Sequence, residues 1–67
     1  MNKVKAYRKK VRLSRRELAK RTGLSVSNIC FIETGKVVAK LSDACKIADV
    51  LNRSLDDLFP PFIISKE

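Results

Sequence analysis

The stretch that decides the fold is residues 15–36, RRELAKRTGLSVSNICFIETGK. The run Ser14-Arg15-Arg16-Glu17 at its start has the pattern of a capping box, in which the Ser14 hydroxyl accepts the Glu17 N–H and the Glu17 carboxylate reaches back to the Ser14 N–H. A helix is therefore predicted to begin at about residue 15. It turns Leu18 and Ala19 inward, and Gly23 stands where a left-handed residue would end it.

A second helix is predicted to follow after a very short turn. Ser25 is a suitable N-cap, Ile29 and Ile32 mark the inner stripe, and Gly35 is placed to end the helix in the left-handed conformation. The connection between the two helices is Thr22-Gly23-Leu24. Two short helices joined so closely, with a glycine in the turn, predict a helix-turn-helix.

Three further helices are predicted around this motif. Apolar residues at helical spacing indicate one helix over about residues 2–11, another with a wide apolar stripe, and a short last one that ends before Pro60. The residues that mark them are Val4, Tyr7 and Val11; Leu41, Ala44, Ile47, Ala48 and Leu51; and the capping sequence Ser54-Leu55-Asp56-Asp57. The sequence thus predicts an all-α fold of five helices without a strand, in one domain over residues 1–67.

Residues 59–67 are expected to form an apolar C-terminal tail around Phe62-Ile63-Ile64. Two interpretations of this tail stay open. It could fold back over the first and fifth helices and close a small core, or it could contact a second copy of the chain.

Positive charge is concentrated in the first third of the chain. The 67 residues carry 15 Lys and Arg against 7 Asp and Glu, a formal net charge of +8. Residues 1–21 hold ten of the bases and one acid, whereas residues 22–67 hold five bases and six acids. Such asymmetry favours a protein that binds a phosphate backbone. A basic helix kept for solubility is the alternative, and a cationic helix on a membrane surface fits less well because its apolar positions are few.

Several classes of function are disfavoured by composition. The chain has no His, so the commonest general base and half of every Ser-His or Cys-His dyad are missing. Cys30 and Cys45 are too few for a disulfide scaffold and have no metal-ligand spacing. No apolar run approaches membrane-spanning length and no cleavage signal follows the basic start. We expect no enzyme, no metal, no cofactor, no small-molecule ligand and no membrane partner, and we expect a cytoplasmic location.

The motif resembles the helix-turn-helix of phage repressor and Cro-type regulators, also called Xre-like, and the likeness extends from Val4 to Phe59. It implies a five-helix fold like that of lambda repressor, in a DNA-binding regulator of bacterial or phage type. The spacing has a physical reason, because Ala19 lets two helices cross closely, Gly23 takes the positive φ of the turn and Ile29 fills the core under the recognition helix.

The resemblance also implies one scaffold ion pair. In this family an Arg at the position of Arg8 commonly pairs with a Glu at the position of Glu33, and both are present here. Arg8 could also contact a phosphate at its exposed edge. Arg12 stands where the family commonly has Gly, which puts the end of the first helix in question.

Base contacts are expected from the outward positions in the first two turns of the recognition helix, namely Val26, Ser27, Asn28 and Phe31. By resemblance Val26, Ser27 and Phe31 occupy the main base-contact positions, with Asn28 nearer the backbone. Val26 and Phe31 offer only apolar contact, best made to thymine methyls, so thymine is expected opposite them. Alternatively they cover the core edge or bind a protein, and Ser27 and Asn28 serve as local capping groups.

Phosphate contacts are expected where helix N-termini and basic side chains converge. The residues assigned to this role are Ser14, Arg15, Ser25, Thr34, Lys36 and Lys40. Arg15 departs from the family, which usually has Gln at this point.

The leading functional hypothesis is a sequence-specific regulator of double-stranded DNA, a repressor that binds a near-palindromic operator as a homodimer. The competing hypothesis is a protein-interaction module, antitoxin-like or an adaptor, whose DNA specificity comes from a partner. Cys30 and Cys45 are expected to be buried or half-buried structural thiols.

Overall fold

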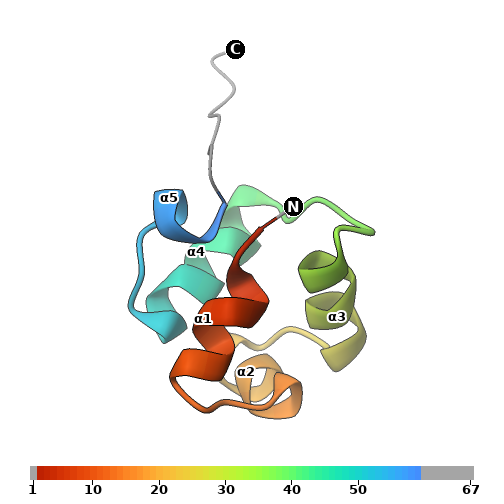
Figure 1. The fold of residues 1–67 in the computed structure, drawn as a ribbon. Coiled ribbons are helices and arrows are strands. Elements are labelled where there is room, and N and C mark those ends of the chain that lie inside the picture. The colour runs from red at the N-terminus through yellow and green to blue at the C-terminus, as the bar shows by residue number, and fades with distance from the viewer. Residues whose placement is uncertain (1, 60–67) are drawn as a thin grey trace.

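The structure is a computed structural model that describes residues 2–59. These residues form five helices and no strand (Figure 1): α1 (Val4–Lys10), α2 (Arg15–Thr22), α3 (Val26–Thr34), α4 (Leu41–Leu51) and α5 (Leu55–Leu58). The predicted all-α fold with five helices is therefore confirmed. Within residues 2–59, no helix has the length and apolar character needed to cross a membrane.

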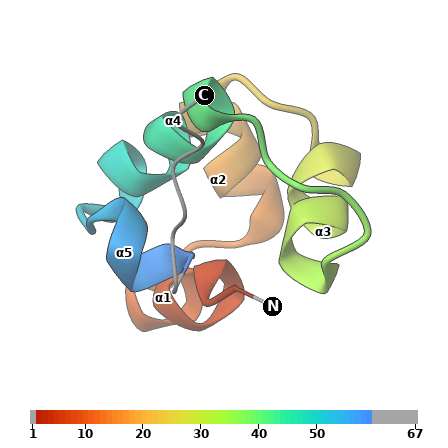
Figure 2. The ribbon, with the colours of Figure 1, turned by 90° about the horizontal axis from the view of Figure 1, so that it is seen from above.

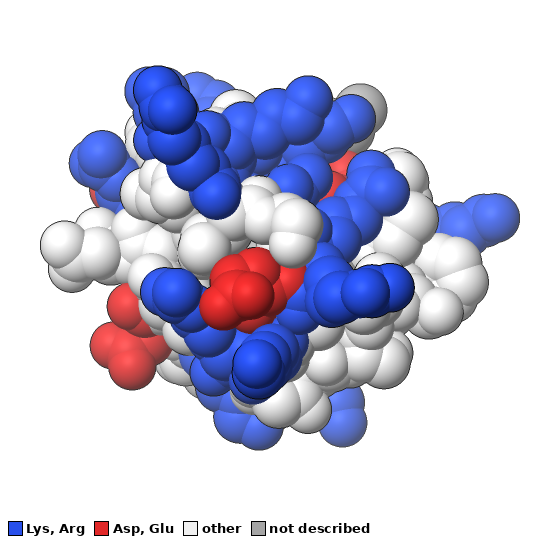
Figure 3. All heavy atoms as spheres, turned by 90° about the horizontal axis from the view of Figure 1, so that it is seen from below, with Lys and Arg blue, Asp and Glu red and all other residues white. Residues whose placement is uncertain are grey.

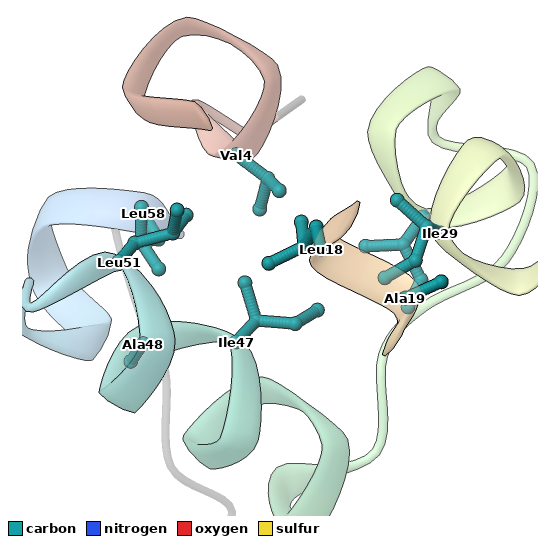
Figure 4. Packing of buried hydrophobic residues seen from close by; sticks show 9 residues of the cluster. Val4, Leu18, Ala19, Ile29, Ile47, Ala48, Leu51 and Leu58 are labelled. Carbon is teal, nitrogen blue, oxygen red and sulfur yellow. The ribbon is translucent and has the colours of Figure 1, made fainter. Parts of the chain in front are cut away.

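The core draws at least one side chain from every helix. Val4, Leu18, Ile29, Ile47 and Leu58 are completely buried. In Figure 4, Leu18 and Ile47 point toward one another in the space between α1, α2 and α4. Burial of one such side chain stabilises the fold by about 1.5–3 kcal/mol. Because α2 packs against both α3 and α4, the core fixes α3 relative to the rest of the domain.

The predicted ends of α2 and α3 are confirmed. Gly23 has φ 78° and Gly35 has φ 81°, so both helices end in the left-handed conformation that glycine adopts without strain. At the other end of α3, the Ser25 hydroxyl accepts the Asn28 N–H at 3.0 Å. Ser54 and Asp57 form a complete capping box at α5.

The capping box expected at α2 is only half formed. The Ser14 hydroxyl accepts the Glu17 N–H at 3.0 Å, as predicted. The Glu17 carboxylate does not return this bond, and instead accepts Arg21 Nε at 3.3 Å, one helical turn further along. This i,i+4 ion pair competes with the cap for the same carboxylate.

Two other expectations about the apolar stripes are wrong. α1 ends at Lys10, so Val11 is not part of the helix and is exposed. Leu41 is the first residue of α4 and is 55% exposed, whereas Ala44, three residues further along the stripe, is buried. Both residues lie at helix ends, where a periodic pattern gives no information on whether a neighbour covers the side chain.

Arg12 follows α1 with φ 61°, in the region where glycine is favoured over residues with a Cβ atom. Arg12→Gly is therefore expected to raise the free energy of unfolding by about 0.5–1 kcal/mol, offset in part by the greater freedom of glycine in the unfolded chain. Urea unfolding would measure this change. Arg12→Ala removes the same charge but keeps the Cβ atom, so it should leave stability almost unchanged; equal stability of the two variants would contradict a strained backbone here.

Residues 60–67 lie outside the part of the chain that the structure describes, as does Met1. The two interpretations of the tail segment Phe62-Ile63-Ile64 therefore remain predictions. Phe59, the last residue described, is half-buried and packs against the core.

Candidate nucleic-acid interface

α3 lies at one edge of the molecule, with α2 between it and α4 (Figure 2). Its inner side chains, Ile29 and Ile32, are buried in the core. Its outer side presents Val26, 44% exposed, and Phe31, 41% exposed. The helix therefore carries two apolar side chains that are partly open to solvent, and neither belongs to the buried core cluster.

Ser27 is exposed and Asn28 is half-buried on the same helix. Neither side chain forms a hydrogen bond to another residue in the range 2–59. The N-terminal cap of α3 is made by the Ser25 hydroxyl instead. The alternative in which they serve as local capping groups is thus not supported, because Ser25 fills that role. Both keep their polar atoms available for another molecule.

The six residues assigned to phosphate contacts differ in whether their side chains are free to donate a hydrogen bond to a phosphate. Ser14 and Ser25 sit at the N-termini of α2 and α3, and each hydroxyl accepts a backbone N–H while its own proton stays available. Lys36 and Lys40 are exposed on the segment after α3. The Thr34 hydroxyl donates to the carbonyls of Cys30 and Phe31, at 2.9 and 3.3 Å, so it has no proton to donate to a phosphate while these bonds last.

The expected ion pair between α1 and α3 is present. Arg8 Nε donates to Glu33 Oε2 at 2.6 Å, and Arg8 Nη1 donates to the Leu13 carbonyl at 2.7 Å. Both side chains are buried, with Glu33 completely inaccessible. The exposed edge that an additional phosphate contact by Arg8 would need is not present, because only 8% of its side chain is accessible.

Arg15 pairs with the same carboxylate. Its Nε donates to Glu33 Oε1 at 3.0 Å, which joins α2 to α3. This hydrogen bond is the largest cause that raises the pKa of Arg15 above its ordinary value, and charge interactions with Cys30 and Glu33 add to it. Arg15 consequently stays cationic at any pH at which the protein is used.

Basic side chains dominate the face shown in Figure 3, with few acidic groups among them. Six Lys and Arg residues at the end of α1 and on α2 are exposed: Lys9, Lys10, Arg12, Arg16, Lys20 and Arg21. The concentration of charge in the first third of the sequence thus becomes a group of exposed basic side chains along the end of α1 and α2. Such a group attracts polyanions over a distance of about a Debye length.

A series of exposed apolar side chains that sequence reasoning did not identify as a group follows along the chain from α3 to the start of α4, and is called the apolar strip here. It consists of Phe31, Val37, Val38 and Leu41, of which Val38 is 94% exposed. Lys36 lies over the Phe31 ring, with its Nζ 5.8 Å from the ring centroid. The run Val37-Val38 in an exposed segment was the signal that could have revealed this strip.

The two cysteines do not behave alike. Cys30 is half-buried on α3, as expected, but Cys45 is exposed on α4, so the prediction for Cys45 is wrong. Cys45 precedes the buried pair Ile47 and Ala48 and borders the groove between α4 and α5 rather than the core. Among residues 2–59, no three His, Cys, Asp or Glu side chains gather where they could hold a metal ion.

Asn2 also has a structural role that sequence reasoning missed. Its Nδ2 donates to the Ile32 carbonyl at 2.7 Å, and its Oδ1 accepts the Val4 N–H at 3.0 Å. It therefore accepts the first N–H of α1, one residue before the N-cap Lys3, and ties the start of α1 to α3. An Asn two residues before an apolar helical position is the pattern that could have indicated the bond to the Val4 N–H.

Comparison with known proteins agrees with this geometry. A family model described as helix-turn-helix matches residues 4–58. Two relatives from Archaeoglobus fulgidus, each called "Uncharacterized HTH-type transcriptional regulator", are 40% and 39% identical over 57 residues, which cover 85% of this chain and 80% and 81% of theirs. "Uncharacterized HTH-type transcriptional regulator MJ0272" from Methanocaldococcus jannaschii is 40% identical over 58 residues, 87% of this chain and 88% of its own.

These three relatives are archaeal, whereas the sequence pattern led us to expect a regulator of bacterial or phage type. The match to the family model covers all five helices and includes the paired helices α2 and α3. The chain belongs to the helix-turn-helix family of DNA-binding transcriptional regulators, of the Xre/Cro/C1 type.

Proposed function

We propose that this protein is a sequence-specific repressor that binds a near-palindromic operator in double-stranded DNA as a homodimer, in the cytoplasm. The observation that carries the proposal is the outer face of α3, where Val26 and Phe31 are exposed, in a domain whose preceding helix α2 carries exposed Lys and Arg side chains. An α-helix with such a face fits the major groove of B-DNA.

Base recognition in this proposal combines apolar and polar contacts. Val26 and Phe31 face thymine methyl groups, which only the major groove displays. Ser27 and Asn28 supply hydrogen bonds to base edges or to the adjacent sugar-phosphate backbone, since their side chains have no partner within residues 2–59. Specificity would then rest on A·T pairs more than on guanine, which calls for Arg or Lys on the reading face.

Backbone contacts would set the register of α3 in the groove. Ser14 and Arg15 lie at the start of α2, Ser25 lies at the start of α3, and Lys36 and Lys40 flank the segment before α4. Helix N-termini add backbone N–H groups and the positive end of the helix dipole. Thr34 would contact a phosphate after its hydroxyl rotates away from the carbonyls of Cys30 and Phe31 within α3.

A homodimer would place two copies of α3 about one helical turn of DNA apart, roughly 34 Å, on the two half-sites of the operator. Repression would follow from occupancy of the site. The residues described contain nothing beyond the DNA-binding fold itself with which to recruit a polymerase.

A second candidate function is favoured by the apolar strip Phe31, Val37, Val38 and Leu41. Exposed apolar patches of this kind commonly mark protein contacts. In that case the chain would be an antitoxin-like or adaptor module, and its partner would provide the DNA specificity.

Salt dependence separates the two functions. Three cations per protomer, Arg15, Lys36 and Lys40, give six phosphate contacts per dimer, so raising the salt from about 50 to about 200 mM should weaken DNA binding about a thousandfold. Fluorescence anisotropy with a labelled duplex measures this directly. Affinity that does not change with salt, or an absence of DNA binding, would favour the protein-interaction module.

A charge-matched pair of variants controls for net charge. Lys36→Ala should lower the salt exponent by about 1 per protomer, because it removes a phosphate contact. Lys46→Ala removes an equal charge on α4, beside the groove between α4 and α5, and should leave the exponent nearly unchanged.

A further inference from the structure

Glu33 on α3 accepts hydrogen bonds from Arg8 on α1 and from Arg15 on α2, and so links three helices. The two arginines differ in how many of their nitrogens have a partner inside the domain. Arg8 of α1 donates to it through Nε at 2.6 Å and through Nη2 at 3.4 Å, and the remaining Nη1 donates to the Leu13 carbonyl. Every nitrogen of the Arg8 guanidinium is thus engaged inside the domain. Arg8 is buried and serves the scaffold, since only 8% of its side chain is accessible.

Arg15 of α2 contacts Glu33 through Nε alone, at 3.0 Å. Neither of its terminal nitrogens, Nη1 and Nη2, has a hydrogen-bond partner among residues 2–59, and its side chain is 37% exposed while that of Glu33 is fully buried. The guanidinium is therefore held on one edge and free on the other. The free Nη1–Nη2 edge is a fork that matches two oxygens of a phosphate.

The position of Arg15 argues against a role in stability alone. Arg15 is the first residue of α2, and Arg16 follows it. Cations are unfavourable at a helix N-terminus, where the helix dipole is positive and anions are preferred. Two arginines at this point are better explained by an anion that approaches the helix from outside.

We infer that Glu33 is a positioning residue for DNA binding, whose buried carboxylate holds Arg15 by Nε so that the Nη1–Nη2 edge receives one phosphate of the DNA backbone. This inference rests on the proposed DNA-binding function. Because Arg15 is ordered before DNA arrives, less side-chain entropy is lost on binding. Glu33 thereby takes part both in the scaffold ion pair with Arg8 and in placing Arg15 against the phosphate that sets the register of α2 on the duplex.

A double-mutant cycle tests the inference, with affinity measured by anisotropy on a labelled duplex of mixed sequence. Arg15→Ala is expected to weaken binding about tenfold and to lower the salt exponent by about 1 per protomer. Glu33→Gln keeps the side-chain shape but removes the charge, and is expected to weaken binding about fivefold through greater disorder of Arg15. In the Arg15→Ala background, Glu33→Gln should have no further effect.

Arg16→Ala is the matched control, because Arg16 is exposed and has no ion-pair partner within residues 2–59. Its effect should add to that of Glu33→Gln. Additive effects of Glu33→Gln and Arg15→Ala, in protein that binds DNA, overturn the inference but not the proposed function. A wild-type protein that binds no duplex overturns the proposed function and this inference with it.

A measurement on the wild-type protein keeps the inference testable if Glu33→Gln does not fold. Nitrogen relaxation of the arginine Nε–H groups reports their mobility on the picosecond to nanosecond timescale. In the free protein, the Nε–H of Arg15 should be about as rigid as the backbone, whereas that of Arg16 should be mobile. Equal mobility of the two groups would show that Glu33 does not position Arg15.

Discussion

Val26→Asp is expected to lower the affinity for DNA about a hundredfold while the protein stays folded. Val26 is the first residue of α3 and is 44% exposed, so the core does not depend on it. A carboxylate suits the N-terminus of a helix, which protects the fold. On DNA, the same charge would enter the major groove between two phosphate backbones and lose the contact with a thymine methyl group. Like charges brought together cost several kcal/mol, of which about 2.7 kcal/mol corresponds to a hundredfold loss. Anisotropy with a labelled duplex, together with thermal unfolding, measures both effects.

Cys45→Asp is the control for this variant. It adds the same negative charge at an exposed position of α4 that borders the groove between α4 and α5. It should change the affinity only slightly, through the lower net charge. Wild-type affinity in Val26→Asp would show that α3 does not face the DNA, and equal losses in both variants would show that only net charge matters.

Leu18→Ala is expected to reduce the free energy of unfolding by about 3–4 kcal/mol, since it empties a fully buried site in the core. Leu18 lies on α2, which packs against both α3 and α4. Small domains have a total stability of about 5 kcal/mol or little more, so this variant would keep only about 1–2 kcal/mol and a measurable minority of its molecules would be unfolded. Denaturant unfolding followed by circular dichroism measures the loss.

The same substitution at Leu41 is the matched control. Leu41 is 55% exposed at the start of α4, so Leu41→Ala should change stability by less than about 0.5 kcal/mol. A loss of several kcal/mol at Leu41, or almost none at Leu18, would contradict the arrangement of the core described above.

Local signals in the sequence predicted most of the fold correctly. Gly23, Gly35, Ser25 and Ser54 mark helix ends through interactions that span four residues or fewer, and all four act as predicted. The Glu17 carboxylate was misassigned because two local partners, the Ser14 N–H and Arg21, compete for it at nearly equal spacing. Local pattern alone cannot decide between them.

The features that sequence reasoning missed depend on contacts between distant segments. Arg15 and Glu33 are 18 residues apart, and only the packing of α2 on α3 brings them to 3.0 Å. Asn2 reaches Ile32 across 30 residues. The exposure of Cys45 likewise follows from where α5 leaves α4 uncovered, which no periodicity shows.

The outer face of α3 was predicted because its inner face is so well defined. Once Ile29 and Ile32 are assigned to the core, helical geometry places Val26 and Phe31 outside. What these two side chains contact depends on a partner that is no part of the chain. Their contact with bases therefore remains a prediction.

The most direct test of DNA recognition by α3 is selection of bound sequences from a random duplex library at moderate salt. The proposed function predicts an enriched near-palindrome with half-sites about one helical turn apart and thymine at the bases that face Val26 and Phe31. The same selection with a Phe31→Ala variant should lose the preference at one position of each half-site. Binding to every duplex without enrichment would contradict sequence-specific reading by α3 and would favour a protein partner for its apolar face.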